Sequence, residues 1–165
     1  MIDQETLKGA IEYVLNKTPR MPFLCLPVSA TLYAILKDNH NVDAKLVTGD
    51  LTYKGQYIFR QDFSIKTAQS DVFQKWAGHA WVEFGGMICD LSIFRTLYSD
   101  EFTKPCRSEL VQIFGQGRGC LIASQSIMQV AYGLSYNAID YLDDDMATGI
   151  IKGFEPLLAH GNENR

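Results

Sequence analysis

The sequence contains no long apolar run, no cluster of basic residues and no closely spaced pair of cysteines. A membrane-spanning helix needs about 18 to 20 consecutive apolar residues, so we expect no membrane insertion. Lysine and arginine number 15 against 19 aspartates and glutamates, and this balance gives no electrostatic footprint for nucleic acid. The first residues also lack the basic start and apolar centre of a secretory signal, which predicts a cytoplasmic protein.

The cysteines are few and far apart. Cys25, Cys89, Cys106 and Cys120 form no Cys-x-x-Cys pair and are too sparse for a disulfide framework in a chain of 165 residues. We therefore expect four free thiols.

Hydrophobic periodicity and turn signals divide the chain, whose length fits a single domain over residues 1–165. The expected helices are 4–17, capped by Asp3, then 27–38, 94–102 and 144–160, the last interrupted at Gly153 and Pro156. The expected strands are 44–53, 56–65, 79–84, 87–92 and 119–124. Residues 125–142 fit the hydrophobic period of a helix as well as that of a strand. We expect a loop at 115–119 and a frayed tail over the last six residues.

The clearest hairpin signal in the chain is "HAWVEFGGMICDLS", because two apolar runs flank the pair Gly85–Gly86. A two-residue turn places Asp90 opposite Trp81, so that His79 and Asp90 become diagonal neighbours on one face. Such neighbours are about 7 to 8 Å apart at the backbone, within reach of a hydrogen bond between imidazole and carboxylate. Cys89 points to the other face and cannot share a zinc ion with His79.

Each member of this predicted pair also has an ordinary structural interpretation. A half-buried histidine can bond to the backbone, and an aspartate at a strand end can cap the turn that follows it. The placement of His79 and Asp90 side by side favours a catalytic role if a nucleophile lies nearby. Cys25 is the candidate, because it lies at or just before the start of helix 27–38, where N–H groups and the helix dipole favour a thiolate. An isolated cysteine is otherwise most often a small core residue.

Two stretches of the sequence resemble the transglutaminase-like cysteine superfamily. They are "CLPVSATLYAILKDNHNVDAKLVTGDL" and "GHAWVEFGGMICDL", and the second is the more specific. Members share a nucleophilic cysteine opening a helix, a histidine heading a strand and an aspartate on the next strand. The bacterial transglutaminase-like proteases and the leader peptidases of lasso-peptide maturation are the most similar members. The segment between Gly49 and Gly78, and everything after residue 95, has no counterpart in the pattern.

The resemblance implies an α+β fold with a papain/transglutaminase-like core, in which a nucleophile helix packs on an antiparallel β-sheet. It further implies that Cys25 is the nucleophile, His79 the base and Asp90 the partner that orients the imidazole. The activity implied is a cysteine peptidase, or an acyltransferase that uses an amine acceptor, on a peptide or protein substrate without cofactor or metal. Trp81 flanks the pair and is a candidate for substrate binding, for shielding the imidazole or for filling the core.

Two other classes of protein remain open at this point. The chain could be a transglutaminase-like binding or regulatory domain without turnover, with the acidic run 140–146 as a partner surface. It could also be a structural metal protein, since cysteine, histidine and aspartate are all zinc ligands. The sequence does not indicate the oligomeric state.

Overall fold

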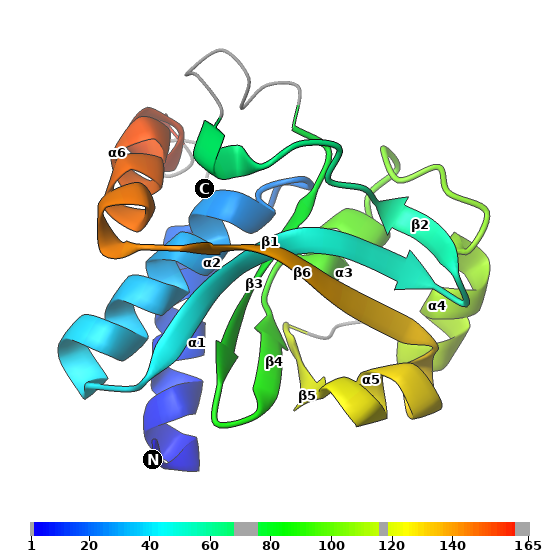
Figure 1. Cartoon of the computed structure of the whole chain (residues 1–165), viewed down its shortest axis with the longest axis horizontal. Coiled ribbons are helices and arrows are strands. Elements are labelled where there is room, and N and C mark those ends of the chain that lie inside the picture. Colours follow the sequence, from blue (N-terminus) through cyan, green and yellow to red (C-terminus); the bar gives the residue numbers. More distant parts are fainter. Residues whose placement is uncertain (1, 68–75, 116–118, 161–165) are drawn as a thin grey trace.

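Helices cover both faces of one antiparallel sheet in the computed structural model of the chain (Figure 1), which describes residues 2–67, 76–115 and 119–160. The sheet has six strands, which are β1 (Ala44–Tyr53), β2 (Gln56–Phe59), β3 (His79–Phe84), β4 (Met87–Asp90), β5 (Leu121–Ser124) and β6 (Leu134–Leu142). The strand order is β2-β1-β3-β4-β5, and β6 pairs with β1. The fold is therefore of the α+β class.

The central strand β1 has three partners. β6 pairs along one edge of it, while β3 and β2 share the other edge. On that shared edge Gly49 pairs with His79 of β3, and Leu51, two residues further, pairs with Phe59 of β2. Residues two apart on a strand point to the same face, so the side chains of His79 and Phe59 are neighbours.

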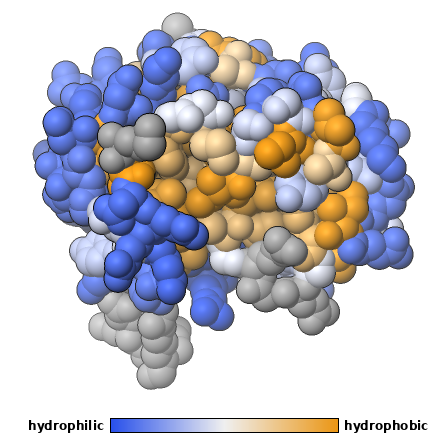
Figure 2. Space-filling model, turned by 90° about the horizontal axis from the view of Figure 1, so that it is seen from below, coloured by the Kyte–Doolittle hydropathy of each residue, from blue (hydrophilic) through white to orange (hydrophobic). Residues whose placement is uncertain are grey.

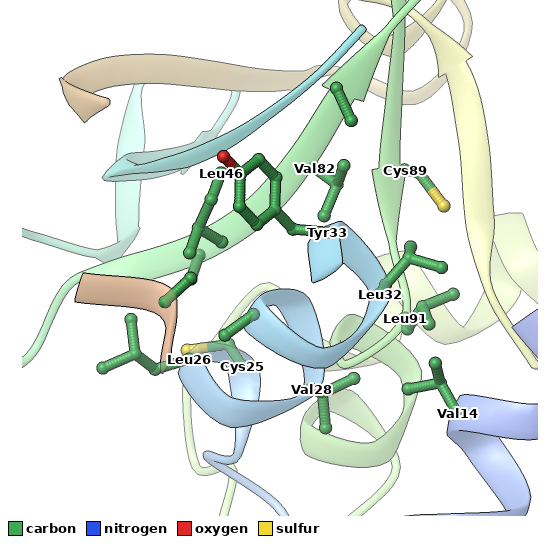
Figure 3. Packing of buried hydrophobic residues seen from close by; sticks show 14 of the residues in the cluster. Val14, Cys25, Leu26, Val28, Leu32, Tyr33, Leu46, Val82, Cys89 and Leu91 are labelled. Carbon is green, nitrogen blue, oxygen red and sulfur yellow. The ribbon is translucent and has the colours of Figure 1, made fainter. Parts of the chain in front are cut away.

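One face of the sheet is covered by α1 (Gln4–Lys17), α2 (Cys25–Ala34) and α6 (Asp144–His160). α1 is amphipathic and begins at the expected cap, where the Asp3 carboxylate accepts a hydrogen bond from Thr6 N at 2.9 Å. α2 is apolar almost all round, as is typical of a buried helix. Figure 3 shows Val28 and Leu32 of α2 packed among side chains of α1 and the sheet, with Cys25 at the start of the helix.

The opposite face is covered by α3 (Ile93–Leu97), α4 (Arg107–Phe114) and α5 (Gln125–Tyr132). Ser124 is the N-cap of α5, where its hydroxyl accepts from Ile127 N, and Gly133 is the C-cap, in the left-handed conformation. Val130 and Ile127 on this helix are 89% and 47% exposed. Seen from below, the end of the molecule that includes α5 shows apolar surface ringed by hydrophilic side chains (Figure 2).

The predicted hairpin is confirmed. Val82 pairs with Cys89 and Phe84 with Met87 across a two-residue turn at Gly85 and Gly86, both with positive φ. Trp81 therefore packs on the α4 face, whereas Cys89 packs on the α2 face.

Several predicted boundaries were wrong. The second helix begins at Cys25, two residues early, and passes into a π-helical turn, η1 (Ile35–Asn39). β4 ends at Asp90, because this carboxylate turns the backbone into α3 by accepting hydrogen bonds from Ser92 and Ile93. The strand expected at 56–65 ends at Phe59, and the chain then forms a short 3₁₀ turn, η2 (Ile65–Thr67).

The C-terminal half holds two further differences. α6 is one helix from Asp144 to His160 and is not interrupted at Gly153 or Pro156. The ambiguous stretch 125–142 divides into α5 and β6, with Gly133 at the junction. Of the six residues expected as a frayed tail, His160 is the last residue of α6, and 161–165 lie outside the described residues, as does most of the loop 115–119. Within the described part of the chain, no helix is long and apolar enough to cross a bilayer.

Candidate functional site

His79 is fully buried at the first position of β3. The residue before it, Gly78, is covered by the indole of Trp76, and a Cβ atom built on Gly78 would lie 2.5 Å from Trp76 Cζ2. A larger residue at position 78 would displace either the indole or the start of β3. The glycine of the "GHAW" motif thus allows the backbone to approach Trp76 closely next to the histidine.

His79 and Asp90 meet as the hairpin register predicts. His79 Nε2 lies 2.6 Å from Asp90 Oδ2, and both side chains are shielded from solvent. An ionised carboxylate can only accept, so Nε2 carries the hydrogen of this bond. The interaction therefore defines the ring orientation and leaves Nδ1 as the second nitrogen.

Asp90 is held on both of its oxygens. Oδ1 accepts hydrogen bonds from Ser92 N, Ser92 Oγ and Ile93 N at 2.9, 3.0 and 3.0 Å. Oδ2 accepts from the hydroxyl of Tyr136 at 2.9 Å in addition to His79. A buried carboxylate with this many donors is stabilised in its charged form.

The electrostatics of the pair follow from these contacts. Burial opposes a charge on His79, but the Asp90 carboxylate outweighs burial and, with a smaller contribution from Cys25, raises the pKa of the imidazole to about 10. Burial would likewise raise the pKa of Asp90, but His79 and the hydrogen bonds from Ser92 and Tyr136 hold it below its ordinary value. Burial, followed by the neighbouring carboxylate, raises the pKa of Tyr136 well above its usual range, so the phenol remains a donor. Asp90 thus favours the protonated form of the imidazole, which makes His79 a stronger acceptor for a proton.

The start of α2 brings Cys25 to this pair. Ser29 Oγ donates to the carbonyl oxygen of Ala80 at 3.0 Å, which anchors α2 beside the residue that follows His79. Cys25 lies four residues earlier, about one helical turn of 5.4 Å from Ser29. Its side chain is near enough to affect the pKa of the imidazole. Nδ1 of His79 has no hydrogen-bond partner among the described residues, so this nitrogen is available to a thiol close to the ring.

Aromatic rings enclose the imidazole. The ring of Phe59 stacks on His79 with centroids 4.7 Å apart and planes 7° from parallel. Trp81 and Tyr136 flank it at 6.3 and 6.1 Å and contact each other edge to face. Trp81 has no exposed surface, and its indole N–H donates to Glu83, so it fills the core beside the pair and offers no surface to a substrate.

Sequence reasoning did not find Tyr136 or Phe59. Tyr136 lies in the stretch 125–142, whose hydrophobic pattern fits a helix as well as a strand. The pairing of this stretch with β1 could therefore not be assigned from the sequence. Phe59 lies in a predicted strand, but only its register against Leu51, two residues from the partner of His79, places it against the imidazole. Neither residue has a local motif that would have identified it.

The other three cysteines do not contribute to the pKa shift of His79 as Cys25 does. Burial, followed by the Asp90 carboxylate, raises the pKa of the Cys120 thiol. Cys89 is on the opposite face of the hairpin, and burial raises the pKa of its thiol well above its usual range. Cys106 is the N-cap residue of α4, and burial also raises the pKa of its thiol. All four cysteines are free thiols, as expected. Among the described residues, no group of three metal-ligating side chains gathers to hold an ion.

The acidic run at 140–146 has partners inside the chain. Asp140 is buried and accepts from Gln61 Nε2 at 2.7 Å. Asp143 accepts from Met146 N at the start of α6. Asp144 forms an ion pair with Lys37 at 2.6 Å. These contacts explain much of the acidic run without an external partner.

The comparisons with known proteins leave function to be argued from this geometry. The sequence matches no family model and no curated protein. A solved structure, described as the crystal structure of a genomics target, superposes with a TM-score of 0.41 at 15% sequence identity. The match covers 97% of this chain and 76% of the other. Similarity at this level carries no conclusion about family or activity.

Proposed function

We propose that the chain is a thiol-dependent hydrolase or acyltransferase that acts on an amide bond, in the first place a cysteine peptidase. Cys25 is the nucleophile, His79 the base and Asp90 the partner that orients the imidazole. The observation that carries the proposal is the buried 2.6 Å contact between His79 Nε2 and Asp90 Oδ2, with Cys25 next to the ring and Nδ1 free of other described partners. Covalent acyl transfer needs a nucleophile, a base and a group that orients the base, and these three residues can fill those roles.

The reaction begins with the proton of the Cys25 thiol. The proton passes to Nδ1 of His79, and the imidazolium stabilises the thiolate beside it. The sulfur attacks the carbonyl carbon of the substrate, and the C–N bond breaks as His79 returns the proton to the leaving amine. A thioester on Cys25 remains. Water releases a carboxylic acid from it, whereas an amine acceptor forms a new amide.

The start of α2 can stabilise the oxyanion of each tetrahedral intermediate. The first N–H groups of a helix have no partner within the helix, and these are the N–H groups of Cys25 and Leu26. Leu24 at the N-cap supplies no side-chain hydrogen bond, and Pro27 has no N–H group. A backbone donor of this kind is worth about 3 to 4 kcal/mol of transition-state stabilisation.

The test is selective alkylation of Cys25 by iodoacetamide, followed by mass spectrometry of peptides. Cys106 is a matched internal control, because it also lies at a helix start and is 9% exposed, compared with 6% for Cys25. At pH 7 we expect Cys25 to react about tenfold or more faster than Cys106. Cys25→Ala should abolish the fast labelling, while Cys89→Ala, Cys106→Ala and Cys120→Ala should leave it intact.

The role of the base is tested in the same assay. His79→Gln should slow alkylation of Cys25 by about 100-fold, since the group that accepts the thiol proton is gone. Equal labelling of Cys25 and Cys106, or of all four thiols only after unfolding, would contradict an activated nucleophile. An activated Cys25 that never forms a thioester with a panel of peptide esters and amides would instead favour a domain without turnover.

A further inference from the structure

A groove of about 330 Å³ lies between β2 and the loop that joins α3 to α4. Figure 1 shows β2 and this loop at the same corner of the molecule. The residues that line the groove come from the segments around the proposed active site and from the loop, and they include Phe23, Tyr57, Phe59, Ala77, Phe102 and Lys104. Phe23 is two residues before Cys25, and Ala77 is two residues before His79.

Phe23 is held in an unusual backbone conformation. Its φ is +61°, in the left-handed region that non-glycine residues rarely adopt. Its N–H group donates to Thr96 Oγ1 at 3.0 Å, which holds this conformation from the neighbouring helix α3. The ring is nevertheless 48% exposed, so the strain presents an aromatic side chain at the groove instead of burying it.

The wall of the groove is continuous with the imidazole. Phe23 contacts Phe59 edge to face, with centroids 6.5 Å apart, and Phe59 stacks on His79. Tyr57 is 49% exposed at the other end of β2, and Phe102 forms a buried part of the lining. A side chain in this groove would lie against Phe23, which precedes Cys25 by two residues, and against Phe59, which stacks on His79.

The charges around the groove balance. Arg60 lies over the ring of Tyr57 and pairs with Asp62 at 3.1 Å. The loop contributes one residue of each sign, Glu101 and Lys104. This balance does not favour a charged occupant of either sign. Ligand pockets span about 300 to 1,000 Å³, so the groove suits one large side chain and not an extended ligand.

We infer that this groove binds a neutral, aromatic side chain of the acyl substrate, next to the carbonyl that Cys25 attacks. The inference rests on the proposed function and names its substrate class. Aromatic pairs favour the edge-to-face and offset geometries that Phe23 and Phe59 already adopt with each other. A bound aromatic ring would complete this arrangement and cover the exposed faces of Phe23 and Tyr57.

The test compares two chloromethyl ketones, of N-acetyl-phenylalanine and of N-acetyl-alanine, which differ only in the side chain. The thiolate of Cys25 displaces chloride and forms a thioether, which mass spectrometry locates. We expect the phenylalanine reagent to label Cys25 about tenfold or more faster than the alanine reagent. Phe23→Ala and Tyr57→Ala should each lower this ratio several-fold.

Val130→Ala is the matched control, because it truncates an exposed apolar side chain outside the groove and should leave the ratio unchanged. Fast labelling of Cys25 with no preference between the two reagents would overturn the inference and leave the proposed function standing. Labelling of Cys25 no faster than that of Cys106 by either reagent would overturn the proposed function itself. A preference that survives both groove variants would show that the aromatic ring binds elsewhere.

Discussion

At the scale of single residues, Asp90 connects three parts of the chain. It pairs with His79 of β3, accepts from Ser92 and Ile93 at the start of α3, and accepts from Tyr136 of β6. Removing a hydrogen-bond donor from a buried charge lowers the free energy of unfolding by more than an ordinary hydrogen bond contributes, because water cannot replace the donor. The hydroxyl of Tyr136 is thus a positioning group for the imidazole, although it touches neither the thiol nor its proton.

We predict that Tyr136→Phe lowers the free energy of unfolding by about 1.5 to 3 kcal/mol, the range for hydrogen bonds to charged groups. Urea denaturation measures this change. Alkylation of Cys25 should slow less than in His79→Gln, since the base remains. Tyr13→Phe is the control, because Tyr13 is 54% exposed and its variant should match the wild type. A Tyr136→Phe variant as stable as Tyr13→Phe would show that Tyr136 does not support Asp90.

At the scale of elements, the junction on β1 decides where the site lies. β3 and β2 meet along one edge of this strand near Gly49, and the register against β6 shifts between Thr48 and Gly49. A Cβ atom on Gly49 would overlap the backbone carbonyl of Asn137 on β6. The bulge and the close approach of two backbones therefore require glycine directly opposite His79.

Gly49→Ala should accordingly destabilise the protein by about 2 kcal/mol or more, because a backbone must move to relieve the overlap. Thermal and urea unfolding measure the change. Gly149→Ala is the matched substitution, since Gly149 lies in α6 with open space around it. Alanine there should stabilise the protein by about 0.5 to 1 kcal/mol. Equal effects of the two substitutions would contradict the close packing of β1 against β6.

At the scale of the whole molecule, the buried pair makes stability depend on pH. The pKa of His79 rises from its ordinary 6.5 to about 10, so its contribution to folding is complete below pH 6.5 and is lost as pH rises towards 10. The pKa of Asp90 is lowered from 3.8, so its contribution is present above pH 3.8 and is lost as pH falls below that value. Together the two groups contribute most between about pH 4 and 6.5.

We therefore expect the urea midpoint of the wild type to fall between pH 6.5 and pH 9. The same midpoint in His79→Gln should vary less over this interval, because the group that binds an extra proton in the folded state is absent. Parallel curves for the two proteins would show that His79 titrates at the same pH folded and unfolded. His40 and the other three cysteines are common to both proteins, so the difference between the curves reports His79 together with its neighbour Cys25.

Local patterns predicted the parts of the fold that depend on neighbours in the chain. The Asp3 cap, the strand 44–53 and the turn at Gly85–Gly86 follow from short-range hydrogen bonding and backbone conformation. The contact between His79 and Asp90 belongs to the same class, because a two-residue turn determines the register of the strands it joins. The boundaries at Cys25, Phe59 and Asp90 were missed, since packing and side-chain hydrogen bonds set them.

The sequence by itself thus determined the hairpin, the face that His79 and Asp90 share, and the separation of Cys89 from them. Only the tertiary structure decided that Ser29 anchors the start of α2 beside Ala80, that Tyr136 reaches Asp90 and that Phe59 stacks on His79. The physical reason is the separation of the contacting residues along the chain. A turn transmits register across a few residues, whereas these contacts join segments that the pairing of β1 with β2, β3 and β6 brings together.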